Sequence, residues 1–198
     1  MPTFLHAVCG VGDKTRTTRE FSRPEWQEVR MDTDESAKPD VVSSLLDMNM
    51  LKDGTFDAAF TSRSLERLYS HEVGPALANL RRVLSDTGYL IVACSDLQLA
   101  CALIAEDKLL DPAYESPSGP VSPLDILYGY RPAIAAGHVN HARRCGFTVK
   151  ALIGSLVQAG FASVWGCRRP EIFTILAIAC KAKTPGDTLK EMAKTHFG

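Results

Sequence analysis

The sequence predicts an α/β protein with a doubly wound, mostly parallel sheet that ends in an antiparallel strand pair. Three observations lead to this prediction. Short apolar strand patterns alternate with helical patterns along most of the chain. The run "YLIVACS" is apolar throughout, as expected at the centre of a parallel sheet covered on both faces. The last two strand patterns, "SVWGCRR" and "EIFTILAIACK", are joined only by a short Arg-Pro turn, so they must pair in antiparallel orientation.

Four strand patterns lie in the first third of the chain. The first, residues 3–10, runs into a glycine turn, and the second covers residues 27–34. A basic, polar stretch interrupted by Pro24 joins them, which predicts an unusually short first crossover. Apolar runs at residues 39–48 and 54–62 complete the set.

Three helices are expected in the rest of the chain. The clearest has Ser70 as its cap and Gly88 as its stop. Its apolar positions follow the i, i+3, i+4, i+7 rule: Val73, Ala76, Leu77, Leu80, Val83 and Leu84. Residues 96–109 continue as a second helix, and a third starts after Thr148 and ends at Gly160.

The domain organisation is expected to be simple, because 198 residues suit one domain. We predict a single domain over residues 1–183 and a polar tail over 184–198 that frays. Residues 111–137 contain five prolines and predict a long functional loop. We define the lid as residues 111–147, within the single domain.

Composition excludes several function classes. The 22 basic and 23 acidic side chains leave a net charge of -1 without long runs of either sign, so nothing indicates a nucleic-acid partner. The six cysteines lack zinc-like spacing, which favours reduced, structural thiols and no metal site. The sequence has neither a signal-peptide pattern nor an apolar run long enough to cross a membrane, and a cytoplasmic location is therefore expected.

Four motifs in order carry a resemblance to a known family: "LHAVCGVG", the acid Asp32, "LLDMNMLKDGTFDAAFTSRSLERL" and "ALANLRRVLSDTGYLIVAC". Over residues 4–180 the chain resembles class I S-adenosylmethionine-dependent methyltransferases of the methyltransferase-11 type, more narrowly a group of small bacterial members. The resemblance implies a Rossmann-like, seven-stranded methyltransferase fold. It also implies S-adenosylmethionine as cofactor, with S-adenosylhomocysteine as product.

Candidate cofactor residues follow from spacing and from the resemblance. Gly10 and Gly12 have the spacing of a turn that lets backbone approach the methionine part, and Asp32 that of an acid binding ribose hydroxyls. The resemblance implies that Asp47 binds the adenine amino group and that Met48 lies on the adenine ring or offers its backbone N–H. It also places Thr61 and Ser62 along the wall near the sulfonium.

The glycine motif departs from the family pattern at two positions. The pattern has an acid at position 6 and glycines at 8, 10 and 12, whereas this chain has His6 and Val8. A β-branched valine disfavours positive φ and adds bulk beside the cofactor. Three functions therefore stay open: an S-adenosylmethionine-dependent methyltransferase, a degenerate methyltransferase fold that serves as a binding or interaction protein, and an NAD(P)-dependent oxidoreductase. The incomplete glycine fingerprint and the antiparallel strand pair count against the last of these.

The acceptor is expected to be a small molecule, bound beneath the lid. The lid offers candidate substrate contacts: Tyr128, Tyr130, Arg131, His138 and His141. Arg63 and Arg67 stand where related sequences often have histidines, so no general base can be identified, and Glu66 is interpreted as a capping or solvated acid. Catalytic residues thus remain unassigned, and a homodimer is an open alternative.

Overall fold

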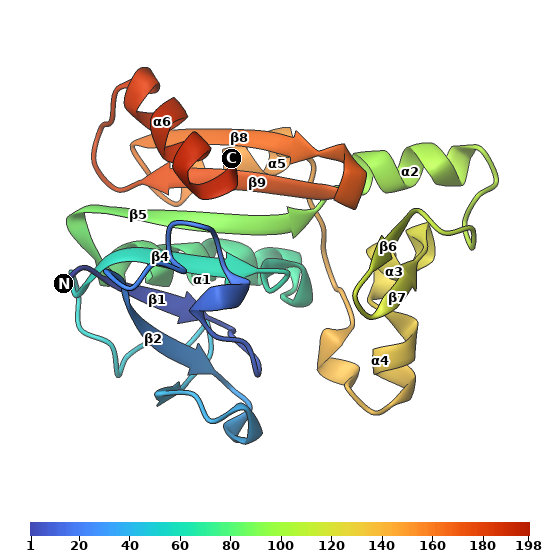
Figure 1. Ribbon diagram of the computed structural model, residues 1–198, viewed down its shortest axis with the longest axis horizontal. Helices are drawn as coiled ribbons and strands as arrows, with labels where there is room; N and C mark the ends of the chain where they lie inside the picture. The colour runs from blue at the N-terminus through green and yellow to red at the C-terminus, as the bar shows by residue number, and fades with distance from the viewer.

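The computed structural model describes residues 1–198. Its main feature is a seven-stranded sheet in the order β3-β2-β1-β4-β5-β9-β8 (Figure 1). The strands are β1 (Thr3–Ala7), β2 (Gln27–Asp32), β3 (Val41–Val42), β4 (Phe56–Ser62), β5 (Leu84–Ser95), β8 (Ser163–Arg169) and β9 (Thr174–Cys180). The first five strands are parallel, and β9 lies antiparallel between β5 and β8. The predicted doubly wound sheet with a terminal antiparallel pair is confirmed.

Six α-helices and a small hairpin complete the fold. The helices are α1 (Ser70–Val83), α2 (Leu97–Ala105), α3 (Pro123–Tyr128), α4 (Arg131–Ala135), α5 (Val149–Gln158) and α6 (Gly186–Phe197). The hairpin consists of β6 (Tyr114–Ser116) and β7 (Gly119–Val121). No helix combines the length and apolar character needed to span a membrane.

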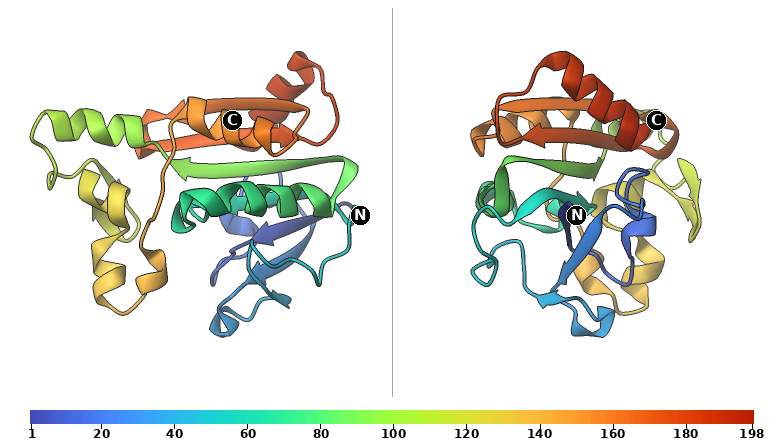
Figure 2. Two further views of the ribbon diagram at one scale, coloured as in Figure 1. Left: turned by 180° about the vertical axis from the view of Figure 1, so that it is seen from behind. Right: turned by 60° about the vertical axis from the view of Figure 1, so that its left-hand side comes forward.

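The two faces of the sheet are covered differently. Helices α1 and α5 lie on one face and α6 on the other (Figures 1 and 2). Between β1 and β2 there is no α-helix, only a 3₁₀ turn at Lys14–Arg16, which confirms the short first crossover. In its place Phe21 and Trp26 pack against Phe4 and Phe60 beneath α6. The segment after the glycine turn therefore forms part of the second core.

Both predicted ends of α1 are wrong. Tyr69 is the N-cap, and its backbone N–H donates to Glu72 Oε2 at 2.8 Å. At the other end α1 passes directly into β5 at Leu84, and Gly88 lies inside that strand. Leu84 pairs with Phe56, so strand pairing rather than a glycine cap ends the helix. A Cβ at Gly88 would lie 3.1 Å from Phe56 O, which explains the glycine.

The expectation of a fraying tail is also wrong. Residues 186–197 form α6, whose Leu189 and Ala193 are each only 6% exposed. His196 is similarly buried and stacks edge-on against Phe21. The tail is amphipathic rather than simply polar, and its apolar side covers the second core.

The lid has secondary structure of its own where the sequence suggested a long loop over residues 111–137. It contains the β6–β7 hairpin, α3 and α4, which lie beyond the carboxyl ends of the sheet strands (Figure 1). Val121 and Ile126 are buried against Ala100 of α2. The Ser122 hydroxyl and Asp125 carboxylate form a capping box on α3, which explains how a proline-rich segment becomes ordered.

Candidate functional site

The first cavity lies at the carboxyl ends of β1, β2 and β4, where open α/β sheets bind their ligands. Its volume is about 470 Å³, within the range of about 300–1,000 Å³ typical of small-molecule sites. Seven of the predicted contact residues line it: Val8, Gly10, Gly12, Asp32, Ser62, His138 and His141. The structure thus brings together residues from the glycine turn, β2, β4 and the lid.

The glycine turn has a strained residue at its first position. Val8 has φ +59° and Gly10 has φ +55°, both in the left-handed region. This conformation suits a glycine but crowds a side chain with a Cβ. The Val8 backbone N–H donates to Met31 O at 2.8 Å, and its side chain packs against the main core. Valine therefore keeps the left-handed geometry expected of the missing glycine, at a conformational cost.

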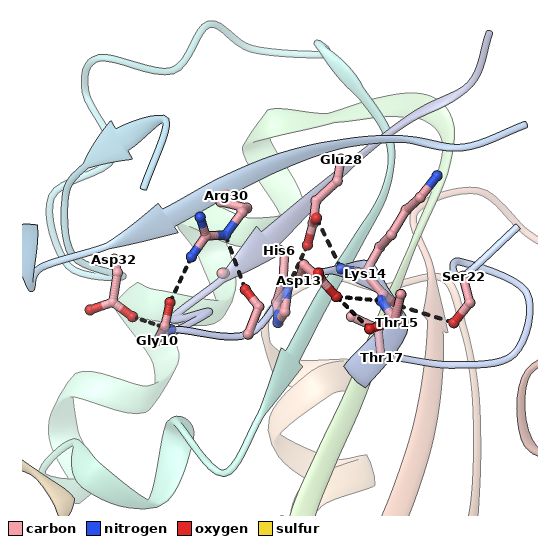
Figure 3. A network of polar contacts seen from close by, with 12 residues as sticks. His6, Gly10, Asp13, Lys14, Thr15, Thr17, Ser22, Glu28, Arg30 and Asp32 are labelled. Carbon is pink, nitrogen blue, oxygen red and sulfur yellow. Dashed lines mark hydrogen bonds and ion pairs between the residues drawn. The ribbon is translucent and has the colours of Figure 1, made fainter. Parts of the chain in front are cut away.

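Asp32 joins the glycine turn to the end of β2. Its Oδ2 accepts a hydrogen bond from Gly10 N at 2.7 Å (Figure 3). Its Oδ1 accepts one from Asp34 N at 3.0 Å. The residue is 6% exposed and borders the cavity. Since a carboxylate oxygen can accept more than one hydrogen bond, Asp32 keeps acceptor capacity for a ligand hydroxyl.

Arg30, which the sequence analysis missed, holds the glycine turn from its other side. Its guanidinium donates to Gly10 O at 2.9 Å and to Gly12 O at 3.0 Å (Figure 3). The same side chain donates to Ala37 O and Lys38 O. Arg30 thereby fixes the turn to the loop that follows β2.

Glu28, the first charged residue of β2, pairs with His6. The Nδ1 of His6 lies 2.7 Å from Glu28 Oε1, and Glu28 Oε2 accepts from Lys14 N at 2.9 Å (Figure 3). Burial lowers the pKa of His6, although the neighbouring Glu28 opposes the shift. Because side chains alternate along a strand, Glu28, Arg30 and Asp32 share one face of β2. That alternation in "QEVRMD" was the signal available in the sequence.

Thr61 and Ser62 have different environments at the end of β4. Thr61 is fully buried, and its hydroxyl donates to Ala7 O at 3.1 Å and contacts Ser64 Oγ, so it ties β4 to β1. Ser62 borders the cavity. Arg67, a few residues further on, also lines it and makes no ion pair in the structure.

Asp47 and Met48 lie outside the lining of the first cavity. Met48 is fully buried in the main core. Asp47 is exposed, and its Oδ1 accepts from Asn49 Nδ2 at 2.9 Å. Their contacts with the adenine remain predictions.

The lid contributes histidines rather than tyrosines to the cavity. The rings of His138 and His141 have their centroids 5.6 Å apart, and burial lowers the pKa of His141. Tyr128 is 63% exposed, and the Tyr130 hydroxyl donates to Ser118 O at 2.6 Å. The Arg131 guanidinium pairs with the buried carboxylate of Asp125, with Nε 2.8 Å from Oδ1. The first cavity is not lined by Tyr128, Tyr130 or Arg131.

The structure has no group of three or more potential metal ligands.

Glu66 is not the solvated acid that the sequence suggested. It is fully buried, and its Oε1 accepts from Ser95 N at 2.7 Å. Its carbonyl oxygen accepts from Arg144 N and Cys145 N at the end of the lid. Glu66 therefore joins the end of β5 to the end of the lid, and it does not line the cavity.

The strand order, the antiparallel β9 and the cavity at the carboxyl ends of the central strands define the class I methyltransferase fold. Comparison with known families agrees, since residues 5–92 match the family model described as "Methyltransferase domain". No curated protein sequence matched the chain. The match covers slightly less than half of the chain, and solved S-adenosylmethionine-dependent methyltransferases share its fold.

Three solved structures illustrate the likeness. A SAM-dependent methyltransferase from Methanosarcina mazei has a TM-score of 0.59 at 14% identity, with 92% of this chain and 93% of that chain covered. A possible histamine N-methyltransferase from Thermotoga maritima has a TM-score of 0.56 at 16% identity, with 92% and 83% covered. The 1,6-didemethyltoxoflavin-N1-methyltransferase of Burkholderia thailandensis, solved with bound 1,6-didemethyltoxoflavin and S-adenosylhomocysteine, has a TM-score of 0.55 at 15% identity, with 92% and 72% covered. At these identities the likeness establishes the fold.

Proposed function

We propose that this chain binds S-adenosylmethionine in the first cavity and transfers its methyl group to a small-molecule acceptor. The observation that carries the proposal is Asp32, a nearly buried carboxylate that borders the cavity and is fixed by the backbone N–H of the glycine turn. A carboxylate after the second strand is the group that such folds use for ribose hydroxyls. The methyltransferase family match over residues 5–92 supports the same interpretation.

The residues present fit the cofactor in this proposal. Gly10 and Gly12 would let the backbone approach the methionine part, Asp32 would accept from the ribose, and Ser62 would face the sulfonium end. When bound, the cofactor supplies an electrophilic methyl group, whose carbon takes the acceptor's lone pair while the electron pair of the broken C–S bond stays on sulfur. The turn and Asp32 position this group, which is the main requirement of such a transfer.

His6 offers a substitute for the acid that the family pattern has at its position. Burial favours the neutral imidazole, since it lowers the pKa of His6. If Nδ1 carries the proton and donates it to Glu28 Oε1, Nε2 is left as a hydrogen-bond acceptor. His6 lines the cavity and makes no other side-chain hydrogen bond. We infer that this nitrogen accepts from the cofactor's ammonium group in place of a carboxylate.

Calorimetric titration of S-adenosylhomocysteine tests the proposal. We expect saturable binding by the unaltered chain and loss of binding in Asp32→Asn, whose amide nitrogen removes one acceptor beside the ribose. Asp187→Asn is the matched control, because Asp187 is an exposed residue of α6 that does not line the cavity. Equal affinity of Asp32→Asn and the unaltered chain would contradict the assignment of the site.

The second candidate is a methyltransferase fold that no longer binds the cofactor. It is favoured by the left-handed Val8 and by the histidine at position 6. Absence of binding to the unaltered chain, combined with binding by Val8→Gly, would select this alternative and reject the enzyme.

A further inference from the structure

A second cavity of about 490 Å³ adjoins the first. The two cavities share Arg16, Phe60 and Ser62, so the second begins at the wall that we assign to the sulfonium end. It extends between the segment after the glycine turn, the start of β9 and the end of α6. Its volume and its position suit the molecule that receives the methyl group.

The side chains lining this second cavity are strongly basic. They include Arg16, Arg19, Arg63 and Arg169, and the only acidic side chain among them is Glu171. None of these four guanidiniums forms an ion pair with a carboxylate of the protein. The arginines that do form ion pairs are four others: Arg23, Arg82, Arg131 and Arg168. Concentrated, unpaired positive charge in a concave site attracts and retains anions.

Arg63 is held in position by neutral groups. Its Nη1 donates to Ser95 Oγ and its Nη2 to Thr174 Oγ1, each at 2.6 Å. Its backbone has φ +54°, a left-handed conformation that costs a non-glycine residue about 1–2 kcal/mol. The Arg63 backbone N–H donates to Ala93 O at 2.8 Å, which helps to impose this conformation. The hydroxyls orient the guanidinium without neutralising it, so its charge remains available to a ligand.

The other arginines differ in how much the protein constrains them. Arg169 donates from Nη2 to Phe197 O, again a neutral partner. Arg16 and Arg19 are exposed, and Arg16 is near enough to Asp13 to help lower the pKa of that carboxyl. Two partly buried, oriented guanidiniums and two free ones at the rim form the arrangement expected for binding a polyanion.

We propose that the methyl acceptor is a small polyanion, bearing phosphate or several carboxylate groups, which binds in the second cavity. The role of this anion as methyl acceptor rests on the proposed function, whereas the anion site is defined by its own residues. Arg63 and Arg169 bind the anionic groups, Arg19 attracts them at the rim, and Arg16 lies between the acceptor and the cofactor. The uncharged part of the acceptor then faces Ser62.

Titration of inorganic pyrophosphate, and separately of citrate, into protein saturated with S-adenosylhomocysteine tests the proposal. We expect at least one of the two anions to bind without displacing the nucleoside. Arg19→Gln should weaken this binding about tenfold, the effect of losing one charge-assisted contact. Arg19 has no partner in the protein, so its replacement should leave folding unchanged. Arg63→Gln should weaken binding at least as much, and Arg23→Gln, outside both cavities, should have no effect.

Each outcome decides between the alternatives. Binding of pyrophosphate alone assigns a phosphate ligand, and binding of citrate alone assigns a polycarboxylate. Failure of both anions to bind, displacement of S-adenosylhomocysteine by either, or an equal loss in Arg23→Gln would overturn the proposal. If the nucleoside does not bind but an anion does, measured on the unsaturated protein, the proposed methyltransferase function fails while the anion site stands. The converse result leaves the methyltransferase and removes the polyanionic acceptor.

Discussion

Replacing Val8 separates the two effects that this residue has on the glycine turn. Its backbone is left-handed, with φ +59°, and its side chain lies between the first cavity and the main core. Val8→Gly removes both the backbone strain and the side chain. Val8→Ala removes most of the side chain but retains a Cβ, and with it the strain.

The expected free energies of unfolding follow from these differences. Glycine relieves about 1–2 kcal/mol of left-handed strain and loses about 0.5–1 kcal/mol through the freer unfolded chain. Both variants lose roughly half of the 1.5–3 kcal/mol that full burial of a valine contributes. Val8→Ala should therefore be destabilised by about 1 kcal/mol, or about 2–4 °C in Tm. Val8→Gly should be more stable than Val8→Ala by about 0.7 kcal/mol, the strain relieved less the entropy lost.

Thermal unfolding and calorimetry with S-adenosylhomocysteine measure the two effects independently. We expect affinity to rise from valine through alanine to glycine, because each step removes bulk beside the cavity. An alanine variant as stable as the glycine variant would refute the strain argument. Tightest binding by the valine protein would refute the argument from bulk.

Three further predictions concern residues that support the site and the fold. Arg30→Lys keeps the charge but loses the planar guanidinium that binds the carbonyls of the glycine turn. The free energy of unfolding should fall by about 1–3 kcal/mol, and S-adenosylhomocysteine should bind more weakly. An unchanged Tm would show that Arg30 does not stabilise the turn. Burial lowers the pKa of His196 to about 4 from about 6.5 in the unfolded chain. As pH falls through this range the unfolded chain binds the proton first, so the His196 contribution to the free energy of unfolding should fall by about 3 kcal/mol between pH 6.5 and 4 and stay constant above pH 6.5. The free energy of unfolding, measured with urea at each pH, should depend less steeply on pH in His196→Gln, and equal pH dependence of the two proteins would reject the assignment. Leu189→Ala should cost about 2–4 kcal/mol by leaving a cavity under α6, and a Tm within one degree of the unaltered chain would show that α6 does not support the second core.

The elements that the sequence predicted well are those with local signals. The helix from Thr148 to Gly160 was recognisable because its cap, its apolar spacing and its terminating glycine all lie within one short segment, and α5 has this cap and this end. The antiparallel pairing of β8 and β9 followed from their short connection. By contrast, the end of α1 depended on Leu84 pairing with Phe56, a contact between residues far apart in the sequence.

The sheet class and the position of the glycine turn could be predicted from the amino-acid sequence, because periodicity and turn chemistry are properties of neighbouring residues. The surroundings of these elements depend on contacts between distant parts of the chain. The tertiary structure placed Glu28 and Arg30 against the turn through strand pairing, and it ordered the polar tail by giving its apolar face a core to cover. It also gathered arginines from three distant segments into one cavity, a clustering that local patterns cannot encode because it arises from contacts across the whole chain.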